Sequence, residues 1–162
     1  MMAIIDTNVA ISANGRDTHA SDDCQIRCIE ILEKMATKQY ADAIVLDDLG
    51  LIFDEYSNYL NYSGQPGVGD IFFKFLHDNM YSQEEIRLVS ITPSADARKG
   101  FDELPENEID PSDRKFLAAA VVSGASIFNA LDNDWHEKRD FLSEIKVDVV
   151  QICPEHGCVV EL

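Results

Sequence analysis

The chain has 162 residues, 46% of them hydrophobic, and its 30 acidic and 13 basic residues give a formal net charge of −17. This length is enough to bury a full core, and we expect a single domain over residues 1–162. No apolar run approaches the roughly 18 residues of a membrane-spanning helix, and no basic segment with a cleavage site opens the chain. We therefore expect a cytoplasmic protein without a membrane segment.

The excess of acid opposes generic binding to nucleic acid, because affinity for a phosphate backbone comes from Lys and Arg. Two interpretations of this excess are compatible with each other. Some carboxylates cluster around divalent cations, which would reverse the local potential. The remaining acid forms a surface that is solvated or that faces a basic partner.

Short apolar strands alternate with helical patterns along the chain. The predicted strands are residues 3–6, 43–46, 88–91, 125–128 and 147–152, and the predicted helices are residues 24–38, 49–62, 68–80, 111–123 and 135–145. Helices between strands predict an α/β fold with a mainly parallel sheet covered on both faces. Residues 93–108 lack clear periodicity, and a connection of that length is usually functional or mobile.

Residues 110–135 carry the clearest local pattern. Asp110 is a predicted N-cap, and Pro111 suits the first helical position, where a missing N–H is not needed. Asp113 then falls on the same helical face as Phe116 and points inward. The alternative interpretation is that Asp113 is a first-turn acid that interacts only with the helix dipole.

Further carboxylates stand at the ends of other predicted elements. Asp6 follows the first strand, Asp132 and Asp134 follow the strand of residues 125–128, and Glu55 lies on the apolar face of its helix. The alternative for Glu55 is a rim position with its carboxylate in water. Converging acids cannot all stay ionised without cations. Oxygen ligands without a matching set of His or Cys favour Mg²⁺ or Mn²⁺ over zinc.

The four cysteines occur as two close pairs, Cys24 with Cys28 and Cys153 with Cys158. In the absence of an export signal we expect reduced thiols rather than a disulfide framework. A zinc site built from all four cysteines, or from three of them with His156, is an alternative, although the spacings are not the usual ones.

Four segments of the chain, taken in order, resemble the motifs of the PIN-domain nucleases. IIDTNVAI resembles the opening strand with the first acid, IFDEY contains the second, DRKFLAAAVVSGA fits the helix with the third, and NALDNDW resembles the last. The resemblance implies a Rossmann-like, PIN-like three-layer α/β/α sandwich and a metal-dependent nuclease, most often one acting on RNA. It implies catalytic and metal-binding roles for Asp6, Glu55, Asp113 and Asp132, a fifth ligand or supporting role for Asp134, and a supporting role for Asn8 in orienting Asp6 or water.

The resemblance also bears on cofactors and partners. It implies Mg²⁺ or Mn²⁺ as the cofactor, and a role as a toxin paired with an antitoxin, in defence or in RNA processing. A basic protein partner or antitoxin would suit the acidic surface, and self-association is common in the family. Asn129 departs from the family pattern, which commonly has a small hydroxyl residue there.

Adjacent basic residues are sparse, and two pairs flank the proposed ligands: Arg114 with Lys115, and Lys138 with Arg139. If these side chains ring the acids, they hold the phosphates on either side of the scissile one. The alternative is a solvated basic face. We expect Trp135 to be a core or rim aromatic rather than a platform for a base.

Two other functions remain as alternatives. A haloacid-dehalogenase-like phosphatase also has an acid after its first strand, but it normally has a second Asp two residues later, where this chain has Asn8. A non-catalytic, acidic PIN-like interaction module would need no metal chemistry, although an inactive scaffold has no chemical need for all four acids.

Overall fold

The structure, a computed structural model, describes residues 1–158. Its strands are β1 (Met2–Ile5), β2 (Ala43–Asp47), β3 (Ile86–Val89), β4 (Ser126–Asn129) and β5 (Val149–Gln151). Its helices are α1 (Thr7–Asn14), α2 (Asp22–Ala36), α3 (Leu51–Ser57), α4 (Val68–Asn79), α5 (Arg114–Ser123), α6 (Asp134–Glu137), α7 (Arg139–Glu144) and α8 (Pro154–Gly157), with a short 3-10 helix η1 (Pro111–Asp113) before α5.

The five strands form one parallel sheet in the order β3-β2-β1-β4-β5. Strand β1 pairs with β2 on one side and with β4 on the other, where Ala3 is opposite Ser126. The chain therefore winds outward from β1 in both directions. At such a reversal the carboxyl ends of two neighbouring strands border a crevice in which ligands bind.

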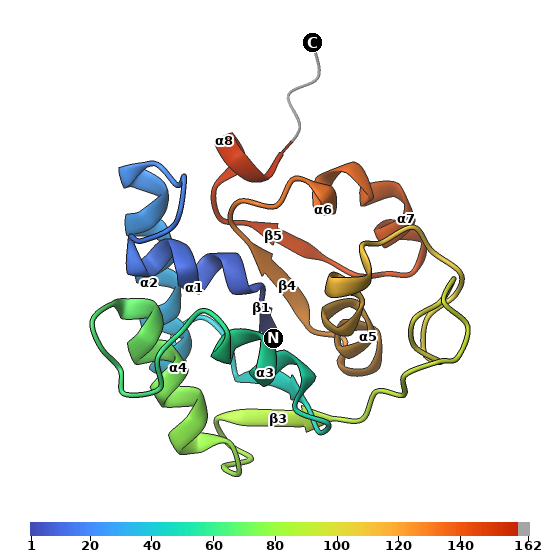
Figure 1. Ribbon diagram of the computed structural model, residues 1–162, viewed down its shortest axis with the longest axis horizontal. Helices are drawn as coiled ribbons and strands as arrows, with labels where there is room; N and C mark the ends of the chain where they lie inside the picture. The colour runs from blue at the N-terminus through green and yellow to red at the C-terminus, as the bar shows by residue number, and fades with distance from the viewer. Residues whose placement is uncertain (159–162) are drawn as a thin grey trace.

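Helices cover both faces of this sheet. Figure 1 shows α1, α2 and α4 on one side and α5, α6 and α7 on the other. The central strands are buried on both faces, as expected for a parallel sheet, and Ile4, Ile5 and Ile127 have no exposed surface. The predicted α/β class is confirmed as a Rossmann-like three-layer sandwich.

Helix α1 was not predicted from the sequence. Strand β1 passes directly into it, and Asp6 caps it by accepting the N–H of Asn8 at 3.3 Å, where the pattern indicated a loop. Its buried residues, among them Val9, Ala10 and Ala13, lie on several sides of the helix, so it shows no amphipathic stripe. Gly69 brings α4 against it, because a Cβ at Gly69 would lie 2.0 Å from the carbonyl oxygen of Ala10.

Other helix predictions were wrong in part. The predicted helix over residues 135–145 is divided into α6 and α7 at Lys138. Helix α3 ends at Ser57, so Tyr59 and Tyr62 lie beyond it and are exposed. Ile71, an apolar residue of the predicted helix over residues 68–80, is 57% exposed because it faces a groove between α2 and α4.

The expectation of reduced thiols was also wrong. Cys24 on α2 and Cys153 after β5 form a disulfide although they are 129 positions apart. They are close because the start of α2 lies beside the segment after β5, where Nε of Arg27 donates to the carbonyl oxygen of Ile152 at 3.0 Å, and no local cysteine spacing reveals this. Cys28 and Cys158 are free thiols, and Cys28 is buried.

The long connection before α5 is fixed to the core by Arg114. This side chain is 8% exposed, and its guanidinium donates to the carbonyl oxygens of Ala97 at 2.6 Å and Ile109 at 3.1 Å. Gly100 has a φ of 82°, and a Cβ there would lie 2.6 Å from Cδ of Arg114, so the position requires glycine. The buried guanidinium of Arg114 therefore holds this connection in one conformation.

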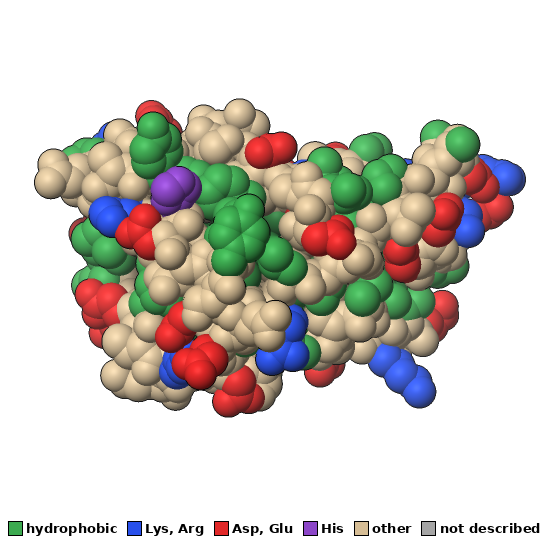
Figure 2. Space-filling model, turned by 90° about the horizontal axis from the view of Figure 1, so that it is seen from below, with side chains coloured by type: hydrophobic (Ala, Val, Ile, Leu, Met, Phe, Trp, Pro, Cys, Tyr) green, Lys and Arg blue, Asp and Glu red, His purple; other side chains and the backbone are tan. Residues whose placement is uncertain are grey.

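The surface reflects the acidic composition. On the face seen in Figure 2, acidic side chains are scattered among hydrophobic and polar ones and do not form a single patch. Among residues 1–158, no helix has the length and apolar character needed to cross a bilayer.

Candidate metal centre

Three of the predicted acids meet at the reversal point of the sheet. Asp6 follows β1, Asp132 follows the neighbouring β4, and Asp113 lies at the start of α5, the helix that leads back into β4. Carboxylate oxygens of these three residues lie within 4.8 Å of one another. The parallel sheet and its return helix therefore bring Asp6 together with two acids that lie more than 100 positions later in the chain.

Asp6 is held in one orientation by its neighbours. It is 5% exposed, and one oxygen accepts the indole N–H of Trp135 at 2.8 Å. The other oxygen accepts the N–H of Asn8. Trp135 is 2% exposed, which fits the predicted core aromatic, but the hydrogen bond to Asp6 was not anticipated. The only sequence indication was its position directly after the acids.

The loop that carries Asp132 is fixed by two asparagines. The Asn129 side chain donates to the carbonyl oxygen of Asp132 at 2.7 Å, and it accepts from Nδ2 of Asn8 at 2.9 Å. Oδ1 of Asn8 in turn accepts the N–H groups of Ala130 and Leu131. Asn8 thus orients the loop that bears Asp132, and Asn129 has a structural role in the same loop.

Burial and mutual repulsion raise the pKa values of the clustered acids. Burial raises the pKa of Asp6 to about 6, and the nearby charge of Asp132 adds to this, although the Trp135 hydrogen bond acts in the opposite direction. The pKa of Asp113 rises to about 8, first through burial and then through Asp6 and Asp132. Burial also raises the pKa of Asp132. At pH 7 Asp113 therefore holds its proton.

Glu55 lies at the edge of the cluster and is not one of the three closest acids. Its carboxylate accepts a hydrogen bond from the Thr7 hydroxyl and pairs with Nζ of Lys115 at 2.8 Å. The side chains of Lys115 and Glu55 are only 15% and 20% exposed, so this ion pair is partly shielded from water. Neither the Thr7 contact nor this ion pair was anticipated from the sequence.

The other residues proposed around the acids are dispersed. Asp134 is exposed, and its N–H donates to Oδ1 of Asp132 at 2.9 Å. Lys138 lies 3.9 Å from Glu108, and the Arg139 guanidinium donates to the carbonyl oxygen of His136. Arg114 is buried in the loop anchor, so the structure does not support its proposed contact with phosphate.

Two clefts adjoin the acidic cluster. One, of about 410 Å³, is lined by Asp6, Asp132 and Glu55 and reaches His19. The other, of about 390 Å³, is lined by Asp113 together with Lys138. Asp6 and Asp132 thus line one cleft and Asp113 lines the other, so the cluster adjoins both.

The chemistry of the cluster fits a hard divalent cation. Its three donors are carboxylates, which are the ligands that Mg²⁺ and Mn²⁺ prefer. Their raised pKa values show that the protein pays an electrostatic cost for holding them together, and a bound cation removes that cost. Asp6, Asp113 and Asp132 would hold the ion, with Glu55 close by.

Because of the acidic cluster, we expect the free energy of unfolding to fall as the pH rises when no metal is present. In the unfolded chain these acids ionise near 3.8, whereas in the fold Asp6 and Asp113 stay protonated up to about 6 and about 8. The folded state therefore binds more protons than the unfolded state over this range. Its free energy of unfolding falls between about pH 4 and pH 8, and Asp6 alone accounts for roughly 3 kcal/mol of the fall. Urea unfolding in EDTA at pH 5 and pH 8 measures the loss.

Addition of Mg²⁺ is expected to restore stability, and to do so more at pH 8 than at pH 5, because the ion competes with protons for the same oxygens. Asp113→Asn should flatten the pH dependence, whereas Asp140→Asn, at an exposed position on α7, should leave it unchanged. Equal pH dependence in both variants and the wild type would contradict the assignment.

Comparisons of the chain with protein-family models, with curated proteins and with solved structures gave no match. The PIN-like assignment therefore stays a prediction that rests on the sequence motifs.

Proposed function

We propose that this chain is a PIN-like, metal-dependent endoribonuclease that uses Mg²⁺ or Mn²⁺. The observation that carries the proposal is the meeting of Asp6, Asp113 and Asp132 within 4.8 Å at the reversal point of a parallel sheet. A partly buried cluster of acids with raised pKa values in a cleft is typical of a catalytic site.

In the proposed hydrolysis, each residue of the cluster has a separate role. A cation held by Asp6, Asp113 and Asp132 would supply an activated water and would neutralise charge on the leaving oxygen. Asp6 is kept in place by Trp135 and by its own helix cap, so its carboxylate is fixed in orientation. Asp113 would give up its proton to serve as a ligand. Lys115, paired with Glu55, places a positive charge beside the position of the scissile phosphate.

Few basic side chains are available to bind the substrate. This favours contact with a short single-stranded segment of nucleic acid. Lys138 lines the cleft beside Asp113, and Lys115 pairs with Glu55 at the edge of the cluster. Together they can contact phosphates next to the scissile one. A net charge of −17 opposes wide electrostatic capture of a duplex.

The test is cleavage of labelled single-stranded RNA and DNA of equal sequence by the purified protein, with Mn²⁺, Mg²⁺ or EDTA. We expect cutting that requires the metal and that is faster on RNA. Cleavage that persists in EDTA would contradict a metal mechanism. No cutting with either metal would favour the non-catalytic interaction module.

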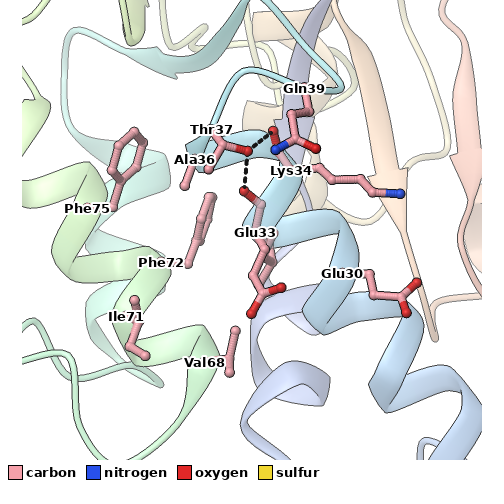
Figure 3. A pocket seen from close by; sticks show the side chains of 11 residues that line it. Glu30, Glu33, Lys34, Ala36, Thr37, Gln39, Val68, Ile71, Phe72 and Phe75 are labelled. Carbon is pink, nitrogen blue, oxygen red and sulfur yellow. Dashed lines mark hydrogen bonds between the residues drawn. The ribbon is translucent and has the colours of Figure 1, made fainter.

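A second surface suits the proposed basic partner. A groove of about 500 Å³ between α2 and α4 has an apolar wall formed by Val68, Ile71, Phe72 and Phe75. Figure 3 shows Glu30 and Glu33 on the α2 side of this groove. An amphipathic helix with basic flanks, such as an antitoxin segment, fits this combination of an apolar wall and a rim that carries Glu30 and Glu33 beside Lys34. We propose the groove as the partner surface and the cytoplasm as the location.

A further inference from the structure

A cluster of sulfur and nitrogen donors lies where the start of α2 meets the segment after β5. The Sγ atoms of Cys24, Cys28 and Cys153 lie within 4.8 Å of one another, and all three residues are buried. A ring nitrogen of His156 and a carboxylate oxygen of Glu155 lie within the same distance of Cys24 Sγ. None of these residues belongs to the acidic cluster.

The three sulfurs lie close enough together to share one ion, and the His156 ring adjoins them through Cys24. Cys24 and Cys28 are one turn apart on α2 and therefore share a side of the helix. Cys153 precedes α8, and His156 follows three residues later within it. Two close pairs from separate elements are the usual source of a structural zinc site, in which sulfurs about 2.3 Å from the ion lie roughly 3.8 Å apart.

A structural disulfide alone does not account for the third cysteine. The bond joins Cys24 to Cys153, yet the Cys28 thiol lies beside both sulfurs. Cys28 is buried and remains a free thiol in the disulfide form. The simpler interpretation is that Cys28 is a small buried apolar residue.

We propose that Cys24, Cys28, Cys153 and His156 form a zinc site that becomes available when the disulfide is reduced. A dithiol reductant gives two electrons and two protons to the Cys24–Cys153 bond and is itself oxidised to a disulfide. Zn²⁺ then displaces the protons of three thiols.

The fourth ligand is His156 rather than Glu155. In the disulfide form Nε2 of His156 accepts the N–H of Ser21 at 3.1 Å, so that nitrogen has the lone pair a metal needs. Glu155 already pairs with Arg27, whose Nε also donates to the carbonyl oxygen of Ile152. These contacts keep the segment of Cys153 against α2 in either form. A reducing compartment, in which disulfides are rare, favours the zinc form.

The test uses the full chain, stripped of metal, in its reduced and oxidised forms. Titration with Co²⁺ should give a thiolate charge-transfer absorption at one equivalent in the reduced chain and none in the oxidised chain. Carboxylates give no such absorption, so binding to the acidic cluster is distinguished. Displacement by Zn²⁺ in the presence of a chromophoric chelator then gives the affinity.

Cys28→Ser keeps the disulfide but should weaken Zn²⁺ binding at least about 100-fold, and His156→Ala, at a half-buried position, should also weaken it. Cys158→Ser is the matched control, because Cys158 is a free thiol outside the cluster, and it should bind as the wild type does. Absence of the thiolate absorption in the reduced chain, or equal affinity in Cys28→Ser, would overturn the proposal.

Discussion

The Asp132→Asn variant is expected to lose metal-dependent cleavage by at least about 100-fold. The change removes one of three carboxylates that lie within 4.8 Å of one another, and an amide is a weaker ligand for Mg²⁺ than a carboxylate. The loop itself should stay in place, because Asn129 binds its backbone and an amide oxygen can still accept the N–H of Asp134. Initial rates on labelled RNA with saturating Mn²⁺ measure the effect.

Stability separates loss of chemistry from loss of fold in this variant. In EDTA, Asp132→Asn should be at least as stable as the wild type, because one repelling carboxylate has been removed. Asp140→Asn, at an exposed position on α7, should keep its activity. Full activity in Asp132→Asn, or an equal loss in Asp140→Asn, would contradict the role of the acidic cluster.

The Asp70→Ala variant is expected to lose roughly 3–5 kcal/mol of the free energy of unfolding, because it removes a buried carboxylate that accepts four hydrogen bonds. Asp70 on α4 has no exposed surface. One oxygen accepts from Asn14 and from the N–H of Asn61, and the other accepts from Arg16 and from the N–H of Gly67. This carboxylate therefore joins the end of α1 to the turn before α4.

Urea unfolding monitored by circular dichroism measures this loss. Asp70→Asn, which keeps one acceptor oxygen and the size of the side chain, should be less destabilised than Asp70→Ala. Asp78→Ala removes an exposed acid from the same helix, where it pairs with Lys74, and no measurable change is expected. A similar loss in Asp70→Ala and Asp78→Ala would contradict the role of the buried network.

Local patterns in the sequence located each strand to within two residues and also located the start of the segment that leads into α5, where Pro111–Asp113 form the 3-10 helix η1 and α5 itself begins at Arg114. The predicted cap at Asp110 is present, with its side chain accepting the N–H of Ser112 at 3.0 Å, and Gly124 ends α5 with a φ of 76°. Such features depend on residues within one turn of each other. Helix α1 was not predicted because it is buried on several sides. It therefore lacks the hydrophobic periodicity by which a surface helix is recognised.

The sequence by itself determined the α/β class, the parallel sheet and the position of Asp6, Asp113 and Asp132 at the ends of elements, since short-range pattern and capping decide these. Only the tertiary structure decided that Trp135 donates to Asp6, that Arg114 is buried and that Cys24 joins Cys153. These contacts join residues brought together by the packing of helices against the sheet. Such packing depends on the shapes of whole helix and sheet faces, and the local spacing of residues in the sequence does not reveal these shapes.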